Sequence, residues 1–209
     1  MLNWLKSKLG IPKEQPLKLE DEVGIHGKVE IHVRDKDGKL IFEEKDDNVV
    51  LTQGKYEIMK MLRNNAAREI LGTPRSICRL VVGDGGCPSS DLFTPKTLDK
   101  SRTALFYPVH IKDITSSSHP TGDALEIIVD ILSDDLIVGD FNPANAGEYL
   151  NEAALVSSIP GTYVAGKPGD PGVDSASEVE ITHKTFKSFP FTPGQTITAT
   201  IKWTLFIVL

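Results

Sequence analysis

The chain has 209 residues, of which 40% are hydrophobic and 25% are charged, with 17 glycines and 13 prolines. This composition is typical of a folded globular protein and excludes a collagen, a coiled coil or a wholly disordered chain, and the length favours a single domain. With 23 basic side chains against 29 acidic ones and a formal net charge of -6, the chain lacks the cationic surface that phosphate backbones require. No nucleic acid is therefore expected as a partner.

The sequence also argues against membrane and metal chemistry. No run of about 18 apolar residues occurs, so no membrane span is expected, and lysines among the first twelve residues argue against a secretory segment. We therefore expect synthesis in a cytoplasm. Cys78 and Cys87 are too few for a disulfide scaffold, their spacing matches no zinc motif, and no histidine stands near them at ligand spacing. Free thiols, no metal and no cofactor are expected.

Residues 1–22 differ in character from the rest of the chain. Their apolar side chains recur at helical spacing, and this pattern ends at Gly10 before a polar stretch. A helix of about ten residues is marginal alone, so the apolar stripe needs a surface to pack on, either on its own domain or on another subunit. A membrane-surface helix would carry more basic residues. We predict a docking arm over residues 1–22 and one domain over residues 23–209. The candidate interface residues of the arm are Leu2, Trp4, Leu5 and Leu9.

Residues 25–34 alternate strictly between apolar and polar side chains, which predicts a half-buried strand. A turn over residues 35–39, with Gly38 available for a positive φ, leads to apolar residues 40–42, so we expect a β-hairpin. Asp35 and Asp37 before this glycine are weakly similar to a calcium-binding loop. Because the remaining ligands and the closing Glu are missing, calcium is not expected.

The next segment carries the single predicted helix, over residues 52–71. Thr52 is a suitable N-cap, and Gly72 and Pro74 follow the last periodic residue. A helix with one apolar face and one charged face is expected to flank a sheet. Its predicted buried stripe consists of Tyr56, Met59, Leu62, Ala66 and Ile70.

Beyond the helix, long strands alternate with loops rich in Gly, Pro, Ser and Asp. The last strand is the clearest, because apolar and threonine side chains alternate along it. One helix and about eight strands joined in this way predict a mainly β protein, a two-sheet antiparallel β-sandwich with one flanking α-helix and the N-terminal arm. The expected strands after the helix cover residues 77–82, 103–114, 124–132, 148–158, 178–187 and 195–209.

Residues 83–86, Gly-Asp-Gly-Gly, follow a predicted strand as phosphate-binding loops do. Such a loop requires a helix N-terminus and usually a Lys behind it. Here Cys87 and Pro88 lead into a polar loop instead. We therefore expect a structural turn and no bound phosphate.

No nucleophile with a base, carboxylate pair or metal cluster is recognisable, so no catalytic residue is assigned and an enzyme is not expected. The acidic neighbours Asp134, Asp135 and Asp140 lie in a predicted loop, where solvated turns are commoner than acid/base pairs. Glu152 interrupts an apolar segment and needs a hydrogen-bond partner, either buried or at an interface. His183 shares a strand face with apolar residues and is expected to be half-buried.

Several strings of the sequence occur in a characteristic order. They are NVVLTQG at residues 48–54, RLVVGDG at 79–85, LNEAAL at 150–155, and TFKSFP at 185–190 followed by IKWT at 201–204. Their order and character resemble small structural proteins of tailed-bacteriophage virions, of the kind placed at the tail, baseplate, neck or fibre attachment. The resemblance spans about residues 48–209 and contains no catalytic motif, and no binding residue is carried over from it.

This resemblance implies a structural subunit of a virion, synthesised in the host cytoplasm, whose partners are other copies of itself and neighbouring virion proteins. Such a subunit must hold its neighbours through arms, edges and loops. A second hypothesis is a β-sandwich module that binds host-surface glycans through loops 83–101 and 159–175, where Phe93 and Tyr163 could stack on sugars. An enzyme of unrecognised type ranks third.

Overall fold

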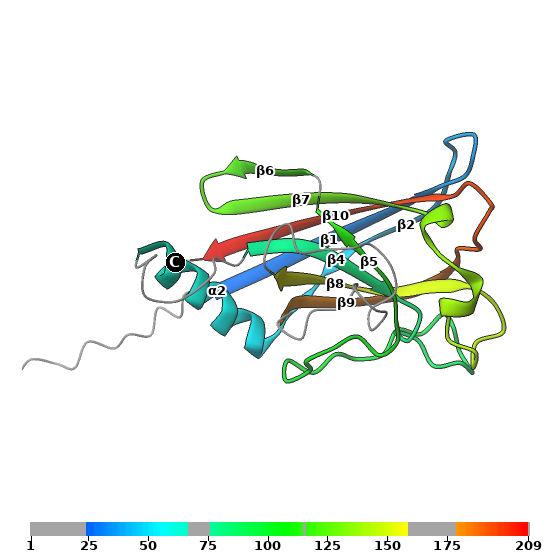
Figure 1. Cartoon of the computed structure of the whole chain (residues 1–209), viewed down its shortest axis with the longest axis horizontal. Coiled ribbons are helices and arrows are strands. Elements are labelled where there is room, and N and C mark those ends of the chain that lie inside the picture. Colours follow the sequence, from blue (N-terminus) through cyan, green and yellow to red (C-terminus); the bar gives the residue numbers. More distant parts are fainter. Residues whose placement is uncertain (1–23, 67–75, 115, 159–178, 209) are drawn as a thin grey trace, which may run out of the picture.

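The computed structural model describes residues 24–66, 76–114, 116–158 and 179–208. Within these ranges ten strands form two antiparallel sheets of five strands each, which face each other with one helix at their end (Figure 1). The predicted mainly β, two-sheet sandwich with one flanking helix is confirmed. The arm predicted over residues 1–22, with its candidate interface residues Leu2, Trp4, Leu5 and Leu9, lies outside the described residues.

Each sheet combines strands from both halves of the chain, in the following order across the sheet. The first sheet contains β2 (Leu40–Asp47), β1 (Gly24–Arg34), β10 (Thr198–Val208), β7 (Ala124–Leu132) and β6 (Ser116–Thr121). The second sheet contains β3 (Val49–Val50), β9 (Val179–Pro190), β8 (Tyr149–Ser158), β4 (Ser76–Gly83) and β5 (Pro108–Asp113). The helix α2 covers Thr52–Ala66, and the short 3-10 turns η1 (Ser133–Asp135) and η2 (Val138–Asp140) follow β7.

The core between the sheets follows directly from the alternation in the sequence. Ile31 on β1 pairs with Ile201 on β10, which pairs in turn with Val129 on β7. The neighbouring row joins Trp203 to Ile127 in the same way. All five side chains are buried, because every second residue of a strand faces the same side of its sheet.

The second sheet is buried on both faces, unlike the first. Leu80 and Leu155 point into the core between the sheets, whereas Val81 and Val156 belong to a smaller apolar cluster on the outer face. Leu105, from the segment that follows β4, completes this outer cluster. Residues 84–107 therefore act as a cover for the outer face, and we call this segment the covering loop (Figure 1).

The helix α2 confirms the predicted start at Thr52, but Tyr56 and Met59, two residues of the predicted buried stripe, are not buried. Tyr56 and Met59 are 68% and 59% exposed, whereas Glu57 is buried. A Cβ atom on Gly54 would lie 2.2 Å from the carbonyl oxygen of Ile181, so the helix approaches β9 through a glycine. The side chains of Leu62, Ala66 and Ile70, and residues 67–71 of the predicted helix, lie outside the description.

Four strand predictions need correction. The strand expected over residues 103–114 begins only at Pro108, because the amide groups of residues 105–107 donate to glutamate side chains and not to a neighbouring strand. The hairpin strand β6 was missed, since its exposed sequence SSSHPT carries no apolar alternation. The returning hairpin strand, expected at residues 40–42, extends to Asp47, and the two-residue strand β3 was also missed. The remaining expected strands are confirmed to within three residues at each end of the described ranges.

Candidate functional site

The glycine run at the end of β4 places the backbone of the covering loop unusually close to its neighbours. A Cβ atom on Gly85 would lie 2.5 Å from the amide nitrogen of Tyr107, and one on Gly86 would lie 2.2 Å from the carbonyl oxygen of Asn151. Real Cβ atoms do not approach backbone atoms this closely. Glycine is therefore required at both positions, because any side chain would prevent the close approach of the backbone. This agrees with the structural turn that was predicted for residues 83–86.

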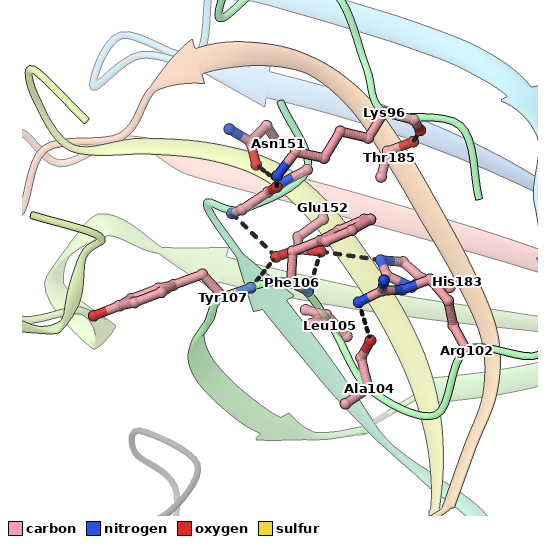
Figure 2. A network of polar contacts seen from close by, with 12 residues as sticks. Lys96, Arg102, Ala104, Leu105, Phe106, Tyr107, Asn151, Glu152, His183 and Thr185 are labelled. Carbon is pink, nitrogen blue, oxygen red and sulfur yellow. Dashed lines mark hydrogen bonds and ion pairs between the residues drawn. The ribbon is translucent and has the colours of Figure 1, made fainter. Parts of the chain in front are cut away.

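The carboxylate of Glu152 on β8 lies at the centre of this region and is completely buried. Its Oε1 accepts hydrogen bonds from the amide groups of Gly85 at 3.0 Å and Tyr107 at 2.8 Å. Its Oε2 accepts one from the amide of Phe106 at 2.9 Å (Figure 2). Both ends of the covering loop thus donate to one carboxylate, so the anion held by this glycine-rich turn is a side chain of the protein itself.

His183 on β9 supplies the fourth hydrogen bond to Glu152. Its Nε2 lies 3.1 Å from Oε2 of the carboxylate, and because an ionised carboxylate only accepts, Nε2 is the donor. The histidine is fully buried, more deeply than the predicted half-buried position. Glu152 therefore has the buried hydrogen-bond partners that its place in an apolar segment predicted.

The ring of Phe106 is held between two cations above the same carboxylate. The Nζ atom of Lys96 lies 4.4 Å from the ring centroid and the guanidinium carbon of Arg102 lies 3.5 Å from it. Cations over an aromatic face are attracted by its quadrupole. Figure 2 shows the phenylalanine, both cations and His183 gathered beside Glu152.

Lysine and asparagine side chains fasten the rest of the loop to the sheet. Lys96 Nζ donates to the carbonyl oxygen of Gly85 at 2.6 Å, while its own carbonyl accepts from Thr185 Oγ1 at 2.8 Å (Figure 2). Asn151 accepts from the amide of Gly86 at 2.6 Å. The contacts converge from β8 and β9 onto one loop, so we call this set, together with Glu152 and His183, the loop clamp.

Two further carboxyl groups border the loop clamp, of which Asp84 is buried and Glu180 is half-buried. Burial raises the pKa of Glu180 to about 7, although the amide of Leu105 donates to its Oε1 at 2.8 Å. Burial also raises the pKa of Asp84 to about 6, against hydrogen bonds from the amide of Asn142 and the side chain of Asn145. In both cases the negative charge of Glu152 adds to the effect of burial.

The arrangement is suited to holding a backbone in place. Glu152 has four donors directed at its two oxygens, and three of them are main-chain amides that cannot move without the loop. A buried carboxyl group whose hydrogen bonds are all satisfied in this way holds its donors in one geometry. Chemically the loop clamp joins residues from both ends of the covering loop to two central strands of the second sheet.

The other residues singled out from the sequence have local structural contacts. Asp135 accepts from Lys112 Nζ at 2.6 Å and from the amide of Leu132 at 2.9 Å. Asp35, in the string that is weakly similar to a calcium loop, accepts from the amides of Asp37 and Lys39 and closes the hairpin turn. Cys78 and Cys87 are free thiols, as predicted. Phe93 is 72% exposed on the covering loop, and Tyr163 lies outside the described residues.

Comparisons with protein-family models, with curated protein sequences and with solved structures found no match to this chain. Among the described residues, no group of three or more His, Cys, Asp or Glu side chains is placed to hold a metal ion. None of the described helical segments combines the length and the apolar character needed to cross a membrane. The loop clamp is therefore interpreted from its own geometry.

Sequence reasoning missed the roles of Glu180, Asp84 and Arg102. Glu180 was taken as part of an ordinary strand, and Asp84 as part of a turn. A signal was present, because acidic side chains at the ends of apolar strands need donors nearby. The donors are backbone amides of residues 105 and 142, which have no sequence signature.

Proposed function

We propose that the chain is a non-enzymatic structural subunit of a tailed-bacteriophage virion, assembling through its arm, residues 1–22, and its loops at the tail, neck, baseplate or fibre attachment. Its partners are other copies of itself and neighbouring virion proteins. The family part of this proposal rests on the sequence resemblance. The structural part rests on the loop clamp.

The observation that carries the structural role is the direction of the hydrogen bonds of Glu152. Its carboxylate is completely buried and is bonded to the amides of Gly85, Phe106 and Tyr107. A catalytic carboxylate must present an oxygen to a substrate or a water. Glu152 presents its oxygens to the backbone, which suits a subunit whose loops must keep one shape.

Three of the strings that carry the resemblance meet at this site. Gly85 ends one string, Glu152 lies in the next, and Thr185 begins the third. Glu152 contacts Gly85 directly, and Thr185 bonds to Lys96 of the same loop. The shared strings thus coincide with contacts that determine the shape of the covering loop.

The arm is tested by deleting residues 1–10 in the phage that encodes the chain. The deleted subunit should fold, as judged by circular dichroism and thermal unfolding, yet be missing from purified particles. As a matched control, the exposed change Lys36→Ala in the hairpin turn should leave incorporation unchanged. Normal incorporation of the deleted subunit would refute the role of the arm.

Glycan binding is the second candidate, favoured by the exposed ring of Phe93 on the covering loop. Aromatic rings stack on the apolar faces of sugars. The isolated chain should then bind host cell-wall glycans on an array, and Phe93→Ala should abolish that binding. Silence across host cell-wall preparations would exclude this candidate.

A further inference from the structure

An apolar hollow opens at one end of the sandwich, between the first sheet and α2. Its volume is about 300 Å³. Figure 1 shows α2 beside the start of β1 and the end of β10, at the end of the molecule opposite the η1 and η2 turns. We call this feature the end hollow. Its apolar lining consists of Ile25, Ile58, Met61, Ile77, Leu125 and Leu205.

The lining side chains are of the kind that proteins bury. Ile77 and Leu125 already pack against the core from its edge, and Leu205 belongs to the core itself. A cavity of about 150 Å³ holds a benzene molecule, so the end hollow has room for a large aromatic or two aliphatic side chains. Exposed apolar surface that is concave and continuous with the core commonly marks a site of association.

We propose that the end hollow binds the N-terminal arm of a second copy of this chain, with Trp4 and Leu5 as the inserted side chains. This inference rests on the proposed function, because it names the receptor for the arm. The arm supplies four apolar side chains at helical spacing. An amphipathic helix in an apolar groove is a recurrent mode of protein recognition.

The position where the described chain begins supports this occupant. Gly24 is the first described residue, and its neighbour Ile25 lines the end hollow. The described chain therefore begins beside the end hollow of its own copy. Copies arranged in a ring or a row bring the arm of one beside the hollow of the next.

The connecting segment is long enough to reach a neighbouring copy. Residues 10–23 can span at most about 46 Å, while a domain of this size has a diameter of about 40 Å. The arm of one copy can therefore reach the end hollow of an adjacent copy.

Charge adds to the match between arm and hollow. Asp123 and His119 are the titratable residues that line the end hollow, and in the arm Lys6 and Lys8 lie in sequence between Leu5 and Leu9. Opposite charges at the rim of an apolar contact orient the partners more than they strengthen binding. The apolar side chains supply most of the affinity.

The test measures association of the purified full-length chain by sedimentation velocity over a range of concentrations. Leu5→Asp disables the arm and Met61→Glu disables the hollow. Each change should weaken self-association at least tenfold. An equimolar mixture of the two variants should form a heterodimer held by one contact, because one variant offers an intact hollow and the other an intact arm. Met59→Glu is the matched control, since Met59 lies on the exposed side of the same helix, and it should associate like the wild type.

Each other outcome overturns the inference in a distinguishable way. A mixture that forms no heterodimer overturns the inference, because the intact arm of one variant then does not bind the intact hollow of the other. If Met61→Glu associates normally while Leu5→Asp does not, the arm binds elsewhere, and the proposed function stands without this receptor. If Leu5→Asp also associates normally, the arm has no role in self-association. The part of the proposed function that assigns assembly to the arm then fails. A wild-type chain that stays monomeric at millimolar concentration also overturns the inference. Leu125→Lys serves as the second hollow variant should Met61→Glu not fold.

Discussion

The covering loop and the end hollow are two borders of the same sandwich, and they differ in what covers them. At the covering loop, the outer face of the second sheet is closed by residues of the chain, with the buried carboxylate of Glu152 bonded to three amides of that loop. At the end hollow, apolar residues such as Ile58 and Leu125 border an opening of about 300 Å³. One border is fixed by directional polar contacts, and the other offers non-directional apolar surface.

This difference matters because the two kinds of contact have different consequences. Buried hydrogen bonds to a charge specify one geometry and are costly to break singly. Apolar surface accepts any chain of suitable shape and is stabilised by whatever covers it. A subunit that must keep its loops in place and also grip neighbours needs both, at separate positions.

The largest expected effect comes from removing the carboxylate at the centre of the loop clamp. Glu152→Ala leaves the amides of Gly85, Phe106 and Tyr107 without their acceptor, and buried groups left unsatisfied cost about 1 to 3 kcal/mol each. We expect the free energy of unfolding to fall by about 4 kcal/mol. Urea denaturation measures this loss, and hydrogen exchange should show the three amides losing protection.

The control for this change is Glu43→Ala on β2. Glu43 also contacts a histidine, His32 at 3.2 Å, but it does so at the surface, where ion pairs contribute little. It should leave the denaturation midpoint unchanged. A clamp role for Glu152 is untenable if both variants behave alike.

The next largest expected effect is a dependence of the free energy of unfolding on pH, caused by Glu180. Burial raises the pKa of this group to about 7, so between about pH 4.5 and 7 the folded chain keeps a proton that the unfolded chain releases. Stability contributed by the protonated form is therefore lost as the pH rises through this window. Glu180→Gln keeps the acceptor for Leu105 and removes the titration. At pH 4 the variant and the wild type should have the same free energy of unfolding. At pH 8 the free energy of unfolding of the variant should be higher by about 3 kcal/mol.

Thermal unfolding of both proteins across that range measures the difference. Parallel curves for variant and wild type would show that Glu180 ionises normally in the folded chain. The position of Glu180 at the border of the loop clamp would then be solvated.

A third change concerns the helix that borders the end hollow. Gly54→Ala places a Cβ atom 2.2 Å from the carbonyl oxygen of Ile181, which forces α2 away from β9. Alanine favours a helix over glycine by about 1 kcal/mol, so a net loss reports the close contact alone. We expect a net loss of about 2 kcal/mol in chemical denaturation. Lys55→Ala, next to it and exposed, should show no loss, and a stabilised Gly54→Ala would contradict the seating of α2.

The smallest expected effect is on the end hollow in the free subunit. Met61→Glu puts a carboxylate at a partly exposed position, so it should lower the free energy of unfolding by no more than about 1 kcal/mol in dilute solution. The same change at Met59 should cost less, because that side chain is already mostly in solvent. Denaturation at low protein concentration compares the two. A large loss for Met61→Glu would mean that the hollow is already filled in the single chain.

The sandwich could be predicted from the sequence because apolar and polar side chains alternate along the strands, which is the pattern of strands with one buried face. Apolar residues occupy every second position around Ile31 on β1 and around Trp203 on β10, and in the structure Ile31 pairs with Ile201 and Trp203 with Val29. The helix was predicted with the wrong face buried. Its contact with the second sheet uses Gly54, against Ile181 of β9, and Glu57, which accepts from Ser157 of β8. Neither residue registers in a hydrophobic pattern.

The candidate site was predictable only in part. Glu152 was singled out because a carboxylate in an apolar segment needs partners, and it has them. Its partners are the backbone amides of residues 85, 106 and 107, and a backbone amide is the same in every residue. Residues 103–107 do not form the expected strand for the same reason. The amide groups of residues 105–107 donate hydrogen bonds to the carboxylates of Glu180 and Glu152, and not to a neighbouring strand.

The contrast between the two borders is tested most directly by hydrogen exchange of the full-length chain at several protein concentrations. Amides of the covering loop bonded to Glu152 should be protected equally at every concentration. Amides that border the end hollow, at the start of β1, in α2 and around residues 122–125, should gain protection as the concentration rises. Protection of the hollow that does not change with concentration, or of the loop that does, would contradict the division between a fixed border and an assembling one.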